Sequence, residues 1–380
     1  MNIGLLGCGV VGGGVLALTQ DRSDIRVTRV LVRRPKEGLP EGAATCDVQD
    51  ILNDAAIDTV VEVMGGLHPA YEYVAAAMER GKHVVTANKA LIAAYYRELT
   101  ALAREKGVAL RYTAAVGGGI PWLVNLARCK RLDTVCAVGG IMNGTTNFIM
   151  DAMHKSPVDF PVILKEAQEL GYAEADPSAD IDGDDIRRKL CISANIAFDT
   201  VLDEETIPTF GIRTVTAADI AAFQAHGFVC KLLAAAERTD RGVCAYVEPT
   251  LVDCGEPEAA VPANYNLIGY VGEQVGRQSF FGQGAGRFPT ASNVVQDCLT
   301  ILAGDRAAYT DRVAPVALDL TAEAHPYYVR TDRPDAFLRS VAADTWGAGV
   351  VTGAVNTGEM LAWAKRQLSA DPVCFIAGIR

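Results

Sequence analysis

The stretch MNIGLLGCGVVGGGVLAL (residues 1–18) decides the fold of this chain. Residues 1–6 are typical of a short apolar strand, Gly7-Cys8-Gly9-Val10-Val11-Gly12 follows, and a helix-like run continues from Val15. A GxGxxG sequence between a strand and a helix predicts a dinucleotide-binding turn. The first glycine permits the tight turn, the second lets the backbone approach a pyrophosphate, and the third lets helix and strand pack closely. The alternative is a glycine-rich turn with a purely structural role.

The pattern after this turn alternates apolar strands with helical runs up to about residue 128. Strand-like segments fall at 2–7, 25–32, 58–64, 83–86 and 108–112. Such alternation predicts a parallel sheet wrapped by helices. We therefore expect an α/β fold whose dinucleotide-binding domain, of the Rossmann type, spans residues 1–130 and is completed by about 284–308.

Two of the predicted strands end in motifs that carry polar groups. The strand at 58–64 ends in Met64-Gly65-Gly66, and the strand at 83–86 leads into Thr86-Ala87-Asn88-Lys89. In parallel α/β sheets, ligands bind outside the carboxyl ends of the strands. Both motifs are therefore expected to face the cofactor.

The end of the second strand bears on the choice of cofactor. An NAD site usually carries Asp or Glu there, to bind the ribose 2'-hydroxyl. This chain has Arg33, Arg34 and Lys36 instead. Cations at this position favour NADP over NAD, and the alternative is a solvated basic turn.

Composition limits the class of protein. The chain has 380 residues and a net charge of −11, which argues against nucleic acids and anionic membrane surfaces as partners. No signal-peptide pattern opens the sequence, and the weakly polar stretch at 114–127 is too short and too broken to span a bilayer. The ten cysteines show no CxxC spacing, which suits a reducing cytoplasm.

The rest of the chain divides into two expected parts. Residues 131–283 contain strand-like segments, including 243–251 and 266–271, and predict a second domain of the α+β type. Residues 315–380 contain the segments PYYVR, DAFLRSVAADTW, AGVVTGAV, EMLAWAKRQL and VCFIAGIR. These read as strand, helix, strand, helix and strand, which predicts a separate small α/β piece.

The most highly charged segment is GYAEADPSADIDGDDIRRK (residues 171–189), which packs six carboxylates between Glu174 and Asp185. It predicts an acidic loop that leads into a helix with one buried face. Asp185 and Lys189 are four residues apart and share a helix face. A lysine beside an aspartate at the edge of a core is a candidate proton donor, while the alternative is a surface ion pair. A calcium loop is excluded, because Lys189 would stand where the bidentate glutamate belongs.

Two further segments are rich in small residues. AAVGGGIPWL (114–123) predicts a loop whose backbone closely approaches something, either a cation or substrate, or else an interdomain hinge. GIMNGTTNFIM (140–150) offers Gly144, Thr145 and Thr146 as donors to a carboxylate. A helix start capped by Asn143 or Thr145 is the alternative.

Seven motifs in this order make residues 1–305 resemble the homoserine dehydrogenase family, which reversibly reduces aspartate 4-semialdehyde to homoserine with NAD(P)H. The motifs are GCGVVG, VVEVMGG, TANKALIA, AAVGGGIP, GIMNGTTNFI, GYAEADPSADIDGDDIRRK and GAGRFPTAS. The resemblance implies a small-molecule substrate, a substrate-binding and dimerisation role for the domain at 131–283, and a homodimer or homotetramer.

The resemblance also implies roles for individual residues. Lys189 matches the lysine that protonates the aldehyde oxygen, Asp185 matches its partner acid, and Lys89 matches a lysine between nicotinamide and substrate. Glu174 and Asp180 match acids around the substrate ammonium and an active-site water. Further substrate contacts correspond to Tyr172, Gly144 and Thr145. Gly284 and Gly286 match a late glycine turn near the cofactor.

A structural sodium ion is implied in the same way. Its ligands are main-chain carbonyls that correspond to Thr113, Val116, Gly118 and Ile120. The chain departs from the family here, because many relatives carry Glu where this chain has Thr113. It also departs at the C-terminus, where PYYVR resembles the first strand of an ACT regulatory module but the usual Pro-Gly turn does not follow.

Two other functions remain open at this point. A dehydrogenase that oxidises the semialdehyde would need a cysteine nucleophile with a paired base, and Cys129 and Cys136 are available. A nucleotide-sensing protein without catalysis is the second, and the presence of both Lys89 and Lys189 argues against it.

Overall fold

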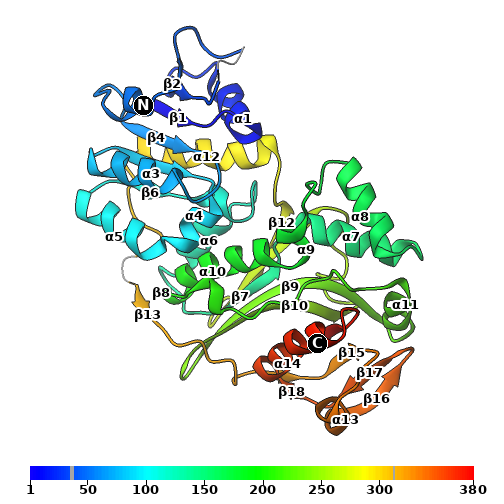
Figure 1. The fold of residues 1–380 in the computed structure, drawn as a ribbon. Coiled ribbons are helices and arrows are strands. Elements are labelled where there is room, and N and C mark those ends of the chain that lie inside the picture. Colours follow the sequence, from blue (N-terminus) through cyan, green and yellow to red (C-terminus); the bar gives the residue numbers. More distant parts are fainter. Residues whose placement is uncertain (35–37, 311–312) are drawn as a thin grey trace. The chain divides into compact units, whose positions relative to one another are not determined.

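The computed structural model describes residues 1–34, 38–310 and 313–380, so Lys36 lies outside the described residues (Figure 1). The chain forms two compact units, each built from several segments. The first unit comprises Met1–Leu132, Asp199–Val201 and Gly282–Ala314. The second comprises Asp133–Phe198, Leu202–Phe281 and Pro315–Arg380.

The first unit contains a parallel six-stranded sheet in the order β3-β2-β1-β4-β5-β6. The chain runs outward from β1 in one direction and then from β4 in the other, so the strand order reverses between β1 and β4. Open parallel sheets bind ligands outside the carboxyl ends of the strands at such a reversal. All five predicted strands are present, and the two-residue β3 was too short to be recognised. The strands are β1 (Asn2–Leu6), β2 (Arg26–Leu31), β3 (Ala44–Thr45), β4 (Thr59–Glu62), β5 (His83–Thr86) and β6 (Leu110–Arg111).

Helices from distant parts of the sequence complete this unit. They are α1 (Val10–Thr19), α2 (Gln49–Leu52), α3 (Ala70–Glu79), α4 (Lys89–Ala94), α5 (Tyr96–Lys106), α6 (Trp122–Cys129) and α12 (Arg287–Leu302). Buried side chains of α12, including Val294 and Cys298, share one core with Val15 of α1 and with the sheet. A Cβ on Gly14 would lie 2.7 Å from the Arg287 carbonyl oxygen. The close packing of α1 on α12 therefore requires a glycine there.

The second unit is built on a nine-stranded mixed sheet in the order β12-β11-β7-β9-β10-β19-β15-β17-β16. Its longest pair, β9 and β10, is antiparallel from end to end. The strands are β7 (Val135–Ile141), β9 (Phe228–Thr239), β10 (Gly242–Asp253), β11 (Tyr265–Gly272), β12 (Gly276–Gln283), β15 (Tyr327–Arg330), β16 (Ala342–Trp346), β17 (Gly349–Thr352) and β19 (Phe375–Ile379).

The C-terminal residues are not a separate piece, which corrects the sequence expectation. Residues 315–380 belong to the second unit, because β19 pairs in parallel with β10 and extends the sheet to β15, β17 and β16. The segment DAFLRSVAADTW, expected as one helix, divides into α13 (Ala336–Val341) and β16. The polar second half of that segment pairs with β17 at the edge of the sheet.

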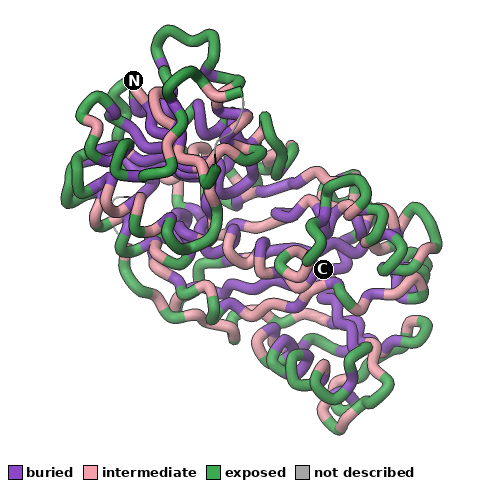
Figure 2. The backbone as a smooth tube through the Cα atoms, turned by 45° about the horizontal axis from the view of Figure 1, so that its top comes forward, coloured by how far each residue is buried: buried purple, intermediate pink, exposed green. Residues whose placement is uncertain are grey.

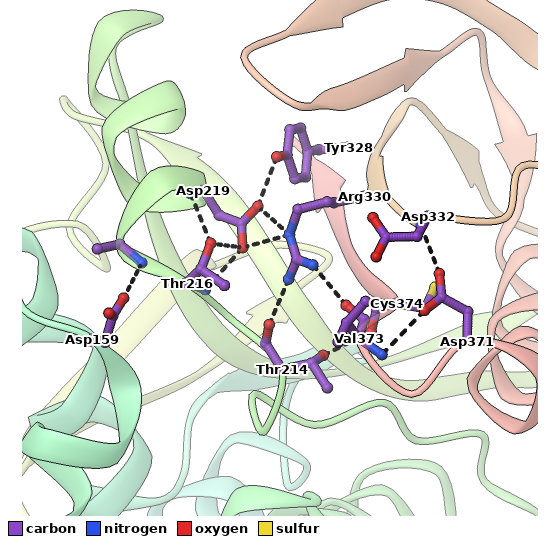
Figure 3. A network of polar contacts seen from close by, with 11 residues as sticks. Asp159, Thr214, Thr216, Asp219, Tyr328, Arg330, Asp332, Asp371, Val373 and Cys374 are labelled. Atoms are coloured by element: carbon purple, nitrogen blue, oxygen red, sulfur yellow. Dashed lines mark hydrogen bonds and ion pairs between the residues drawn. The ribbon is translucent and has the colours of Figure 1, made fainter.

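A buried ionic network fastens the C-terminal strands to the rest of the second unit (Figure 3). The fully buried carboxylate of Asp219 accepts hydrogen bonds from the Tyr328 hydroxyl at 2.7 Å and from Arg330 Nε at 2.8 Å. Arg330 also donates to the main-chain oxygens of Thr214 and Val373. Asp219 completes the capping box of α11 (Ala217–Ala225) with Thr216. One side chain thus joins a helix start to β15.

Helix α7 (Gly144–Lys155) packs on β9 and β11, and helix α10 (Asp184–Phe198) packs on β7 and β9. Helices α8 (Phe160–Glu169), α9 (Ser178–Ile181) and α14 (Thr357–Ala370) also belong to this unit. Buried backbone runs through the strands of each unit in Figure 2. The prediction of one buried face for α10 is wrong, because twelve of its fifteen residues are buried. The sheet covers one side of α10, while α9 and the short helix Glu204–Thr206 contact it elsewhere.

No helix within the described residues is long and apolar enough to cross a membrane.

The Asp219 network yields a prediction about stability. Replacing Asp219 with Ala leaves the Arg330 guanidinium partly buried without its carboxylate, so we expect a loss of about 3–5 kcal/mol. Urea unfolding followed by fluorescence measures this, since Trp346 and Trp363 both lie in the C-terminal part of this unit. The matched control is Asp159→Ala, because Asp159 is exposed and accepts from Ala217 N at 3.3 Å. Equal urea midpoints for the two variants would contradict the role given to Asp219.

Candidate active site

The GxGxxG turn has a different steric reason for each glycine. Gly7 has φ +97°, and its Cβ would contact Met64 and Val63. A Cβ on Gly12 would lie 2.3 Å from the Gly7 carbonyl oxygen, so the helix could not pack on the strand end. Gly9 is exposed, and a Cβ there would meet nothing within 4 Å. The packing of the protein therefore does not require a glycine at position 9. This is expected for a position where a ligand, rather than the protein, approaches the backbone.

Helix α1 begins at Val10, directly after this turn, and Val11 stands in its first turn. Val10 is 68% exposed although it is apolar. Gly9 is the N-cap residue of α1, and it has no side chain that could hydrogen-bond to the amides of the first turn. The amide groups of the first turn and the helix dipole therefore face an uncovered position, where an anionic group is favoured.

A buried carboxylate organises the ends of β4 and β5. Glu62, fully buried at the end of β4, accepts from Met64 N at 2.7 Å, from Gly65 N at 3.3 Å and from the Thr86 hydroxyl at 2.6 Å. Burial raises the pKa of Glu62 above its usual range. Glu62 was not among the predicted site residues, although a glutamate that ends an apolar strand is a recognisable signal.

Asn88 continues this arrangement on the next strand. Its side chain donates to the Gly66 carbonyl oxygen at 2.7 Å and caps α4 by accepting from Leu91 N at 3.1 Å. Lys89 is therefore the first residue of a capped helix, and it is half-buried. Arg33 and Arg34 are exposed just beyond the end of β2.

The glycine loop (Gly117–Gly119) packs against the start of α12 within the first unit. A Cβ on Gly118 would lie 2.5 Å from the main-chain carbon and oxygen of Gly284. Gly286, with φ +124°, N-caps α12. The loop does approach something closely, as predicted, and its neighbour is the backbone of the late glycine turn, which was not among the predicted partners.

In the second unit, Lys189 and Asp185 form a buried ion pair. Lys189 Nζ lies 2.7 Å from Asp185 Oδ2 and donates to the Met142 carbonyl oxygen at 2.7 Å. Their side chains are 8% and 7% exposed. The alternative of a surface ion pair is therefore excluded. Burying two charges is expensive, and such a pair is weak evidence for a stabilising role.

Asn143 joins this ion pair to a second carboxylate. Its Nδ2 donates to Asp180 Oδ1 at 2.7 Å and to Asp185 Oδ2 at 2.8 Å. Burial, and then the negative charge of Asp185, raise the pKa of Asp180. We refer to Asn143, Asp180, Asp185 and Lys189 as the cluster. It contains two carboxyl groups and one ammonium group. With both carboxylates ionised it carries a net charge of −1, which a cationic ligand would neutralise.

The same asparagine starts helix α7. Asn143 Oδ1 accepts from Thr146 N at 2.8 Å, so the helix-cap alternative for this segment is confirmed. A Cβ on Gly144 would lie 2.6 Å from the Asn264 carbonyl oxygen. Because Asn143 belongs to the cluster, the first turn of α7 lies beside it, and the dipole of this helix favours an anion there.

Two predicted substrate-binding residues, Thr145 and Glu174, are placed differently from expectation. The Thr145 hydroxyl, expected to donate to a carboxylate, instead donates to the Tyr172 carbonyl oxygen at 2.6 Å and holds that segment. Tyr172 is 40% exposed and its ring lies beside Phe148. Glu174 is exposed in the loop before α9, outside the cluster. The contacts of Asn143 and of the Met142 carbonyl with the ion pair were not predicted, because they depend on how β7 packs against α10.

The four carbonyls implied as sodium ligands do not fit a cation in this chain. The Asn293 amide nitrogen donates to the carbonyl oxygens of Gly118 at 2.6 Å and Ile120 at 3.0 Å. The Thr113 carbonyl accepts from Val116 N. A donor group thus stands against two of the four oxygens. Among the described residues, no group of three or more His, Cys, Asp or Glu side chains is placed to hold a metal ion.

Comparisons with known proteins agree with this arrangement. The family model of homoserine dehydrogenase matches residues 121–299, and that of its NAD-binding domain matches residues 7–113. Homoserine dehydrogenase of Bacillus subtilis is 38% identical over 323 residues, covering 82% of this chain and 75% of that protein. The Pseudomonas aeruginosa enzyme is 38% identical over 357 residues, covering 88% of this chain and 82% of that protein.

A solved structure extends the similarity over the whole chain. The crystal structure of a homoserine dehydrogenase from Thiobacillus denitrificans has a TM-score of 0.88 and 33% sequence identity. The match covers 100% of this chain and 98% of that one. The glycine turn, the buried cluster and both sheets lie within the matched regions, and this chain belongs to the homoserine dehydrogenase family.

Proposed function

We propose that this chain interconverts aspartate 4-semialdehyde and homoserine, with Lys189 as the proton donor and NADP as the preferred cofactor. Family membership supports the reaction. The observation that supports the assignment of the chemistry is the buried cluster, where Lys189 Nζ lies 2.7 Å from Asp185 Oδ2 and within reach of a second carboxyl group through Asn143.

The cluster and the start of α7 suit the two charged ends of an amino-acid substrate. The substrate ammonium would pair with Asp180, which neutralises the excess negative charge of the cluster. The substrate carboxylate would sit at the first turn of α7, beside Gly144, where the helix dipole favours an anion. Thr145 acts indirectly, by holding the segment at Tyr172 in place.

Lys189 supplies the proton in the reduction. When bound, the reduced nicotinamide cofactor supplies a hydride to the aldehyde carbon. The carbonyl oxygen gains negative charge, and the Lys189 ammonium protonates it to give the alcohol. In the reverse direction the neutral amine of Lys189 accepts the hydroxyl proton. Asp185 fixes the position of Nζ through their 2.7 Å contact.

The first unit would hold the cofactor at the turn formed by Gly7, Gly9 and Gly12. The pyrophosphate would lie at the start of α1, beside Val10 and Val11, and the Glu62 network would hold Met64, Gly65 and Thr86 at the strand ends. We place Lys89, Gly284 and Gly286 at the same cofactor. Arg33 and Arg34 would meet a 2'-phosphate, which is the reason for preferring NADP.

The proposed function does not include a sodium ion, because the Asn293 amide donates hydrogen bonds to two of the carbonyl oxygens that would bind it. We extend the proposal to a homodimer or homotetramer that works in a reducing cytoplasm. Among the described residues the cysteines form no disulfide. Val271, Val275 and Phe281, which are 40%, 50% and 56% exposed, give β11, β12 and their turn an apolar surface that suits contact with a second copy.

The proton donor is tested by replacing Lys189. Lys189→Ala should lower kcat about a hundredfold or more, the usual range for a general acid, while cofactor binding is retained because Lys189 belongs to the second unit. Lys189→Arg keeps the charge but donates a proton poorly, and kcat should fall similarly. The control is Lys165→Ala, since Lys165 forms an exposed i,i+4 pair with Glu169. A correctly folded Lys189→Ala enzyme within tenfold of wild-type kcat would exclude this role.

The ammonium site is tested through pH. Because the pKa of Asp180 is raised, its carboxylate is lost as pH falls through that pKa, and the KM for aspartate 4-semialdehyde should rise on the acid side. Asp180→Asn should raise KM about tenfold or more, as expected for losing a charged hydrogen bond, and should abolish this acid limb. Glu174→Gln is the comparison, because Glu174 is exposed. A larger KM increase in Glu174→Gln would transfer the ammonium site to that residue.

The cofactor preference is tested at Arg33 and Arg34. Charge-assisted contacts with a 2'-phosphate contribute about 1.5–3 kcal/mol each before desolvation. Replacing both arginines with Ser should therefore remove most of the preference in kcat/KM for NADPH over NADH and leave NADH use nearly unchanged. Arg26→Ser is the control, because Arg26 is exposed at the opposite end of β2. A wild type that prefers NADH would overturn this part of the proposal.

A further inference from the structure

Asn293 occupies an unusual position on helix α12. Its side chain is nearly inaccessible, with the residue 6% exposed, and its amide nitrogen lies within hydrogen-bond distance of two main-chain oxygens at once. These are the carbonyls of Gly118 and Ile120, at 2.6 and 3.0 Å. Both belong to the segment around the glycine loop (Gly117–Gly119). One amide group therefore satisfies two buried acceptors.

The glycine loop needs such a donor because of how it packs. A Cβ on Gly119 would lie 2.8 Å from Pro289 Cβ, and Gly119 N donates to the Gln283 carbonyl oxygen at 3.1 Å. Gly118 has φ +54° and lies against the backbone of Gly284. This packing turns the Gly118 and Ile120 carbonyls toward α12. Buried carbonyls require either a donor or a cation.

The next turn of the same helix makes the opposite contact. Asp297, four residues after Asn293, accepts from Thr113 N at 2.9 Å and from the Thr113 hydroxyl at 2.6 Å. Helix α12 thus offers a donor to the carbonyls at one end of the segment 113–120 and an acceptor to the N–H and hydroxyl at the other. The segment is fixed at both ends by side chains of one helix.

We propose that the Asn293 side-chain amide takes the place of a monovalent cation, so that this chain holds its glycine loop without bound sodium. Sodium among these carbonyls would have to occupy the position of the amide nitrogen, whose hydrogens carry positive charge and would repel it. If the amide were reversed, its oxygen would join the two carbonyl oxygens, and a cation would be needed to hold the three together. The two orientations therefore predict opposite responses to sodium.

The wild-type protein, free of cofactor and substrate, gives the first test. It is dialysed free of sodium, and its melting temperature is compared in choline chloride and sodium chloride at equal ionic strength. A ligand that binds only the folded state raises this temperature. We expect a difference below about 2 °C, and isothermal titration of sodium chloride should give only heat of dilution. A larger rise in sodium, or a saturable heat, would overturn the proposal.

A second test changes the amide to a carboxylate of the same shape. In Asn293→Asp, three oxygens converge on one buried point, so we expect melting about 5 °C or more below wild type in choline and recovery of most of that loss in sodium. Asn125→Asp is the matched control, because Asn125 is a half-buried asparagine on α6 that donates to the single Pro121 carbonyl at 2.6 Å. It should melt equally in both salts.

An Asn293→Asp protein that is as stable as wild type in choline would also overturn the proposal, because the carbonyls would then not require a donor. If that variant fails to fold in either salt, the wild-type comparison decides the question. The test uses melting and heat rather than turnover. Its outcome is therefore independent of the reaction proposed above.

Discussion

The buried ion pair of Lys189 and Asp185 constrains the whole second unit. A charged pair at 8% and 7% exposure needs each remaining polar atom to find a partner, and the Met142 carbonyl and the Asn143 amide provide them. Both partners stand at the junction of β7 and α7. The end of a strand, the start of one helix and the first turns of α10 must therefore meet at one point. The folding of this region is inseparable from the assembly of the cluster.

In the first unit, helix α12 has a comparable influence. It returns to the sheet more than 150 residues after α6 and packs on α1 through Gly14. Asn293 and Asp297 then fix the segment 113–120, while Gly286 begins the helix beside the glycine loop. The cofactor turn and the glycine loop thus depend on one late helix. A change in α12 would move both.

Local patterns in the sequence predicted the strands of the first unit and the glycine turn, because each depends on neighbours in the chain. The i,i+4 spacing also predicted the pairing of Asp185 with Lys189, although it could not show that the pair is buried. The contributions of Asn143, Glu62 and Asn293 depend on residues 24 to 175 positions away. The C-terminal strands were predicted to form a separate piece, because neither the sequence of β19 nor that of β10 indicates by itself that the two strands pair in parallel. Glu174 belonged to the same acidic run as Asp180, and only the fold separates the exposed carboxylate from the half-buried one.

Two buried carboxylates, Glu62 and Asp297, and the half-buried carboxylate of Asp180 show how surroundings decide the use of a charged group. Burial raises the pKa of Glu62 and Asp180, and raises that of Asp297 to about 6. Glu62 is surrounded by two main-chain amides and a hydroxyl, and Asp297 by the amide and hydroxyl of Thr113 and by the Tyr309 hydroxyl. These neutral donors occupy the carboxylates fully, so both act as fixed supports. Asp180 instead shares one amide with Asp185, and the like charge of that neighbour raises its pKa further. A cation is the group that relieves this repulsion, which makes Asp180, of the three, the one suited to bind a charged substrate.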